Sequence, residues 1–169
     1  VGISLESQLV TLNNFLKKQK KNKTVIMFPI NQYTNFVEKK LRKLNYENVR
    51  VFKYNPNPEV LTGEIEKLTN YSQRKKNLEL RKKMFEDKED EQSVRQLEKL
   101  EQLYTLGEVN FDSVIIIDFG NNLKSVLTSL VYTDVDQKKV LFTTVNQWFD
   151  ESIFYENSIQ NLYYPSINY

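Results

Sequence analysis

Polar and aromatic side chains follow three segments of the sequence that are predicted to be β-strands. They belong to Asn31, Gln32, Tyr33, Thr34, Asp118, Asn121, Asn122, Thr143, Thr144, Asn146, Gln147 and Trp148. Ligands of open α/β sheets bind just outside the carboxyl ends of the strands, so these groups are expected along one edge of a sheet. They can form hydrogen bonds and stack, but none is an activated nucleophile. The pattern therefore predicts recognition rather than catalysis.

Seven of these residues are candidates for contact with a ligand or a protein partner. They are Asn31, Tyr33, Thr34, Asp118, Asn121, Asn146 and Trp148. The alternative is that the Asn, Asp and Thr side chains serve turns and helix caps, where these residue types are common. Trp148 is the single tryptophan of the chain, and it is either a packing anchor or a contact residue.

Several kinds of chemistry are excluded by what the chain lacks. It has no Cys and no His, which removes thiol nucleophiles, disulfides, His bases and most zinc sites. Neither a phosphate-binding glycine motif nor a G-x-S-x-G elbow occurs. Asp118 and Asp150 are two acids in different predicted loops, which is a weak basis for a metal site. We expect no catalytic residue, no metal and no cofactor.

Apolar segments of strand length alternate with helical patterns along the chain. Residues 114–117, Val-Ile-Ile-Ile, form an unbroken apolar run that is typical of a strand buried on both faces. Strands are predicted at 24–30, 48–54, 111–118, 139–144 and 161–167, and helices at 5–20, 36–45, 121–132 and 150–158. This order predicts an α/β fold with a doubly wound, mainly parallel sheet and helices on both faces. Residues 1–169 then form a single lobe.

Residues 59–106 are too long for one crossover helix. Their composition favours helix throughout, and the charged segment FEDKEDEQ at 85–92 is the best candidate for a break. We expect a long helical hairpin that is inserted into the lobe and leans off the sheet. Its basic and acidic residues nearly balance, so it is not expected to bind nucleic acid, and its apolar stripe is expected to pack within the hairpin.

Charge is distributed unevenly although the net charge is only +2. Residues 1–57 have a net charge of +8, residues 58–106 of −1 and residues 107–169 of −5. The basic first third fits an anionic partner or, more simply, solvated helix faces. No apolar stretch approaches the length needed to span a bilayer. Val1 is not an initiator Met, so we expect a piece of a longer protein in which a missing segment carries any targeting signal or membrane anchor.

The order of the elements resembles one family in particular. An opening GISLESQ and helix precede TVIMFPINQYTN, and a strand ending in VFKYNPNP precedes the long charged helical stretch. In the penicillin-binding protein activator family of Gram-negative bacteria, a phrase like F-D-A-V and then P-D-x-G precedes a helix, a D-V-D turn, a strand and a Trp followed by an acid. The matching residues are Phe111-Asp112-Ser113-Val114, Asp118 with Gly120, Asp134-Val135-Asp136, and Trp148 with Asp150.

The resemblance covers essentially the whole chain and implies the second lobe of a type I periplasmic binding protein fold. The implied function is a non-catalytic periplasmic domain that stimulates peptidoglycan synthesis by contact with a peptidoglycan synthase. The full-length protein would be anchored in the outer membrane. Tyr33, Trp148 and Phe149 would then be contact residues on the loop face.

Two other functions stay open at this point. The first is a solute-binding lobe of the same fold, similar to Leu/Ile/Val-binding proteins, for an amino acid or small peptide. It would use Tyr33, Asp118, Asn121 and Asn146, although the segment P-I-N-Q-Y at 29–33 lacks the acid and glycine of the usual P-D-x-x-x-G. The second is a cytosolic doubly wound enzyme that works with a partner subunit. The lack of His, Cys and phosphate-loop glycines argues against it.

Overall fold

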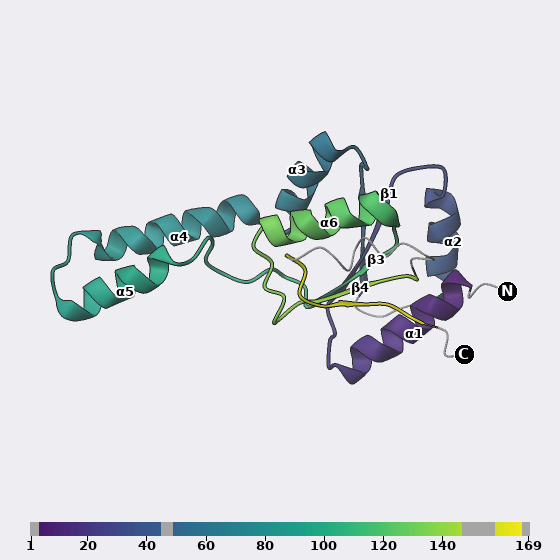
Figure 1. Ribbon diagram of the computed structural model, residues 1–169, viewed down its shortest axis with the longest axis horizontal. Coiled ribbons are helices and arrows are strands. Elements are labelled where there is room, and N and C mark those ends of the chain that lie inside the picture. Colours follow the sequence, from purple (N-terminus) through teal and green to yellow (C-terminus); the bar gives the residue numbers. More distant parts are fainter. Residues whose placement is uncertain (1–3, 45–48, 147–157, 167–169) are drawn as a thin grey trace.

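A five-stranded parallel sheet forms the centre of the described part of the chain (Figure 1). The computed structural model describes residues 4–44, 49–146 and 158–166. The strands are β1 (Thr24–Pro29), β2 (Val49–Tyr54), β3 (Ser113–Ile116), β4 (Leu141–Thr144) and β5 (Leu162–Tyr163). Their order is β2-β1-β3-β4-β5, and every neighbouring pair is parallel. The predicted α/β class with a parallel sheet is confirmed.

Helices cover both faces of this sheet, as predicted. The helices α1 (Leu5–Lys18) and α2 (Thr34–Leu44) pack on one face, and α3 (Pro58–Leu68) and α6 (Gly120–Tyr132) pack on the other. Successive side chains of a strand point to opposite faces, so Ile26 and Phe28 of β1 enter the first core while Val25 and Met27 enter the second. Because helices cover both faces of the sheet, every residue of β1 and β3 is buried, without the alternation of a half-exposed strand.

The helix starts follow local capping chemistry. Ser4 caps α1, because its Oγ accepts a hydrogen bond from the backbone N–H of Ser7 at 3.2 Å. Pro58 opens α3, where its missing N–H costs nothing, and the Asn57 side chain accepts from the N–H of Glu59. Within the described residues, no helix has both the length and the apolar character needed to cross a bilayer.

The segment 59–106 differs in part from the prediction. The expected two helices are three, because α3 is a crossover helix whose Leu61 and Ile65 are buried in the sheet core. The hairpin consists of α4 (Tyr71–Glu86) and α5 (Glu91–Glu101), and its turn lies inside the expected charged segment. Figure 1 shows these two helices projecting away from the sheet. We call α4, α5 and the turn between them the arm.

Arg74 of α4 fixes the base of the arm, although its side chain is only 5% exposed. Its Nε donates to the carbonyl of Gly107 at 3.1 Å, and Nη1 donates to the carbonyls of Thr69 and Thr133 at 3.3 and 2.8 Å. Nη2 donates to Thr105 Oγ1 at 3.1 Å and to the carbonyl of Asp134 at 2.6 Å. All five N–H groups of the guanidinium are therefore used.

Gly63 lies within helix α3, although glycine has a low helix propensity. A Cβ built at this position would meet nothing within 4 Å, so packing does not require a glycine here. We expect Gly63→Ala to raise the free energy of unfolding by about 0.5–1 kcal/mol, because glycine loses more backbone entropy in a helix. Urea denaturation measures this change.

Gly107 provides the matched control for this substitution, because its φ of 104° lies in the left-handed region. Gly107→Ala should therefore lower stability. A destabilised Gly63→Ala variant would show that the backbone of α3 is strained at this position.

Candidate functional site

A cleft of about 520 Å³ opens at the carboxyl ends of β1 and β3. The chain passes from β1 to β2 on one side and reaches β3, β4 and β5 on the other, so the strand order reverses between β1 and β3. This reversal is the place where open α/β sheets bind ligands, because the flanking loops turn away from each other. The cleft coincides with two of the three predicted clusters of polar residues.

The walls of the cleft are mainly apolar and come from both halves of the lobe. Buried wall residues include Phe28 of β1, Val37 of α2, and Ile117 and Val145, which follow β3 and β4. The rim carries three aromatic side chains, with Tyr33 60% exposed and Phe36 and Phe119 each 53% exposed. Aromatic groups exposed around an apolar hollow are typical of a contact surface.

Asp118 is the charged residue that lines this cleft, and its side chain is only 5% exposed. Its Oδ2 accepts a hydrogen bond from the hydroxyl of Tyr54 at 2.6 Å, and its Oδ1 accepts from the backbone N–H of Phe119 at 2.8 Å. Tyr54 ends β2 and is fully buried. The pair therefore links β2 to the loop after β3 across β1, which lies between them.

Burial is the main cause of a raised pKa for both groups of this pair. Burial raises the pKa of Asp118 above its ordinary value, while the hydrogen bonds from Tyr54 and from the Phe119 N–H oppose that rise. Burial, together with the charge of Asp118, raises the pKa of Tyr54 far above its usual range. Tyr54 is thus a permanent hydrogen-bond donor and not an activated nucleophile. The pair can position groups or attract a cation.

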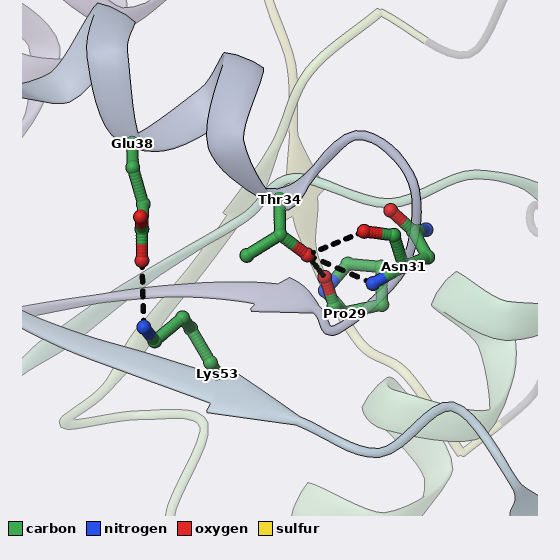
Figure 2. A network of polar contacts seen from close by, with 5 residues as sticks. All are labelled: Pro29, Asn31, Thr34, Glu38 and Lys53. Carbon is green, nitrogen blue, oxygen red and sulfur yellow. Dashed lines mark hydrogen bonds and ion pairs between the residues drawn. The ribbon is translucent and has the colours of Figure 1, made fainter.

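The turn after β1 uses part of the predicted polar set for its own structure (Figure 2). Asn31 Oδ1 accepts from the N–H of Tyr33 at 2.8 Å. Thr34 Oγ1 accepts from the N–H of Asn31 at 2.8 Å and approaches the carbonyls of Pro29 and Asn31 at 3.1 and 2.9 Å. These bonds close the turn and start α2. Asn31 lines the cleft as well, whereas Thr34 does not.

Figure 2 also shows the ion pair that ties α2 to β2. Glu38 Oε1 and Lys53 Nζ are 2.6 Å apart. The hydrogen bond from Lys53 lowers the pKa of Glu38.

The remaining predicted residues divide into three groups. Asn121 and Asn146 do not line the cleft. Asn121 is exposed in the first turn of α6, and Asn146 donates its backbone N–H to Gln8 Oε1 at 2.7 Å. Thr143 and Thr144 are buried and donate to strand β3 carbonyls at 2.8 and 2.7 Å. Trp148 lies outside the described residues, as do Gln147, Phe149 and Asp150. The cleft thus brings together Asn31, Tyr33 and Asp118, with Asn122 beside them.

Three residues of the site were not anticipated from the sequence. Gln8 lines the cleft from α1, where it is 5% exposed and joins α1 to the loop after β4. Phe36 lies on the rim, in the first turn of α2. Tyr54 is the partner of Asp118. A polar Gln at a position of apolar periodicity was the available signal for the first of these.

Among the described residues there is no group of three or more acidic side chains that could hold a metal ion. A comparison with models of known protein families finds no match, and no curated protein is significantly similar in sequence.

Proposed function

We propose that the chain is one lobe of a type I periplasmic binding protein-like protein of the penicillin-binding protein activator kind. In this proposal it acts without catalysis, by contact with a peptidoglycan synthase in the periplasm. The observation that carries the proposal is the apolar cleft at the carboxyl edge with its exposed rim of Tyr33, Phe36 and Phe119. The resemblance of the segment 111–150 to that family supports it.

The mechanism follows from the chemistry of the cleft. Burial of exposed aromatic side chains against a partner releases water from apolar surface, and a few such anchors carry most of the binding energy of an interface. The Asp118–Tyr54 pair keeps the floor of the cleft fixed, so little conformational entropy is lost on contact. The lobe then works as a rigid platform that stabilises an active arrangement of the synthase.

Substitutions at the rim test this proposal. We expect Phe36→Ser and Tyr33→Ser each to weaken binding to a bifunctional peptidoglycan synthase from the same organism by about tenfold or more, which corresponds to about 1.4 kcal/mol. Biolayer interferometry with the immobilised synthase measures the affinity. Both side chains are more than half exposed, so the substitutions should leave the fold intact.

Tyr104 is the matched control, because it is an aromatic residue that is 79% exposed and lies at the base of the arm rather than at the cleft. Tyr104→Ser should bind like the unchanged protein. If Phe36→Ser and Tyr33→Ser bind with full affinity while remaining folded, the rim is not the contact surface. Trp148→Ala extends the same test to the segment that follows β4.

A solute-binding function is the second candidate, and the size of the cleft favours it. A volume of about 520 Å³ is within the usual range for small-ligand pockets, and apolar walls with a few polar groups are typical of them. Asp118 would suit a ligand with an ammonium group. Since one lobe supplies half of such a site, the test requires the two-lobe protein, screened against amino acids and small peptides by thermal shift. A saturable rise in Tm would support this candidate over the first.

A further inference from the structure

One edge of the sheet is formed by β2, which pairs only with β1 among the described residues. The backbone N–H of Ile30 donates to the carbonyl of Tyr54 at 2.8 Å, so Tyr54 turns its backbone polar groups toward β1. Because these groups alternate in direction along a strand, Val49, Val51 and Lys53 turn theirs out of the sheet. Within the described part of the chain, these outward N–H and C=O groups have no hydrogen-bond partner.

The strand β2 lacks the features that usually protect an open edge. It contains no proline and pairs with β1 in one continuous register, so no bulge bends it, and the central Val51 is 47% exposed. Its two charged side chains are held against the lobe. Lys53 Nζ lies 2.6 Å from Glu38 Oε1, and Arg50 Nη2 donates to Asn110 Oδ1 at 3.1 Å. A bare edge of this kind pairs readily with another extended segment.

A hollow of about 420 Å³ lies beside the centre of this edge. It is lined by Val51 and Lys53 of β2 and by Glu38, Leu41 and Arg42 of α2. Directly opposed residues of neighbouring strands place their side chains on the same face of a sheet, so the residue of an added strand opposite Val51 enters this hollow. Since Val51 and Leu41 form the apolar part of the lining, an apolar side chain fits there best.

The other face of the edge carries Phe52 and Arg50. Phe52 is half-buried against the core beneath α3 and α6, and Arg50 is exposed. Glu64 of α3 accepts from the backbone N–H of Asn55, beyond the end of β2, at 2.8 Å. Opposed apolar residues and opposed unlike charges each stabilise a strand pair. An added strand therefore fits best with an apolar residue opposite Phe52 and an acid opposite Arg50.

Charge decides which kind of chain fits this edge. Arg42, Arg50 and Lys53 place positive charge along it, and Glu38, the acid of the hollow, is already paired with Lys53. A second copy of this chain would add the same excess of cations. Antiparallel pairing of two β2 strands about Val51 would also place the two Arg50 side chains diagonally across from each other, where like charges repel. An extended segment that carries acids matches the charge of the edge instead.

We propose that the edge of β2 pairs with an extended segment of a protein partner in which two apolar residues lie between two acids. The segment adds a strand to the sheet through hydrogen bonds to the outward backbone groups of β2. Its apolar residues lie opposite Val51 and Phe52, and its acids lie opposite Arg50 and Lys53. This pattern reads the same in both directions, so it fits parallel and antiparallel pairing alike. The hollow shares no lining residue with the cleft, and the proposal does not depend on the contact proposed there.

The test uses the peptide Thr-Glu-Val-Val-Glu-Thr with blocked ends, titrated into the whole chain. Amide shifts in NMR spectra should change saturably and centre on residues 49–54, and added salt should weaken the binding. A second peptide with Lys in place of each Glu should bind more weakly by about tenfold or more.

Methylated peptides test the backbone pairing. In parallel and in antiparallel pairing, the N–H of the second Val faces β2 and that of the first Val faces solvent. N-methylation of the second Val should therefore abolish binding, whereas N-methylation of the first Val should leave it nearly unchanged. A contact made by side chains alone would not distinguish the two methylated peptides.

Variants of the chain locate the contact. Arg50→Glu and Val51→Ser should each weaken binding of the acidic peptide by about tenfold or more, and both side chains are exposed, so the fold should be kept. Arg81→Glu and Val94→Ser make the same changes at exposed positions of α4 and α5 and should bind normally. Phe36→Ser, which tests the rim of the cleft, should also leave peptide binding unchanged. The NMR spectrum of each variant shows that it is folded.

Three results overturn the proposal. The first is the absence of saturable binding of the acidic peptide. The second is equal binding of the acidic peptide, the basic peptide and the peptide methylated at the second Val. The third is self-association of the unchanged chain, measured by sedimentation equilibrium, that Val51→Ser abolishes, because it would assign this edge to a second copy of the chain.

Discussion

Replacing Arg74 by methionine is expected to lower the free energy of unfolding by about 3 kcal/mol or more. Methionine keeps much of the length of the apolar stem but removes all five N–H donors. Carbonyls of Thr69, Thr133, Asp134 and Gly107 then lose their partner inside the protein.

The position of the guanidinium explains why the effect should be so large. Thr69 and Thr133 are the C-cap residues of α3 and α6, so the cation sits where two helices end and their unpaired carbonyls concentrate negative charge. Thr105 Oγ1 accepts from Arg74 and donates to Asp134 Oδ2 at 2.5 Å, which extends the network to a carboxylate. Burial lowers the pKa of Arg74 and Asp134 opposes that shift, but the ordinary value is so high that the group stays charged.

Two further variants distinguish the contribution of the Arg74 hydrogen bonds from that of its positive charge. Arg74→Lys keeps the charge but offers three donors without the planar fork, so we expect it to recover only part of the loss. Arg81→Met removes an exposed arginine from the same helix and should cost little. Urea denaturation measures all three, and hydrogen exchange of α4 and α5 shows whether the arm opens first. Equal stability of Arg74→Met and Arg81→Met would contradict the role given to Arg74.

The two ends of α4 differ in how well the sequence predicts them. The turn between α4 and α5 was located because the charged segment around Asp87 to Asp90 interrupts the apolar spacing, and Asp90 indeed caps α5. The sequence did not predict the boundary between α3 and α4, because residues that favour helix continue through it. The chain turns there at Asn70, which adopts φ 52°. Asn tolerates the left-handed region and was the only local mark of the helix end.

The sequence predicted the part of the candidate site that directly follows the strands. An apolar run followed by Asp118 and a glycine places that carboxylate at the carboxyl edge, and the parallel order brings Tyr33 to the same edge. The partner of Asp118 lies 64 residues away on β2, and Gln8 lies on α1. Such pairings depend on strand order and helix placement, which the residue pattern of one segment does not contain.

Replacing Tyr54 by phenylalanine is expected to lower the free energy of unfolding by about 2 kcal/mol at neutral pH, because a buried carboxylate loses a short hydrogen bond from a neutral donor. The ring itself is retained, so packing in the core is preserved. Tyr132→Phe is the matched control, since its side chain is 59% exposed and the loss of its hydroxyl should be nearly neutral.

The cost of Tyr54→Phe should depend on pH in a defined direction. The hydrogen bond from Tyr54 lowers the pKa of Asp118, so its removal raises that pKa further above the ordinary value of 3.8. A folded-state pKa above the unfolded value means that the folded protein holds the proton more tightly, and stability falls as pH rises from 3.8 through the raised pKa. The variant should therefore lose least at pH below 3.8, where Asp118 is protonated in both states, and most above its raised pKa. Carbon NMR titration of the Asp118 carboxyl group, with urea denaturation across the same pH range, measures both quantities. A constant cost at every pH, or a lower pKa of Asp118 in the variant, would show that the hydroxyl does not stabilise the ionised carboxylate.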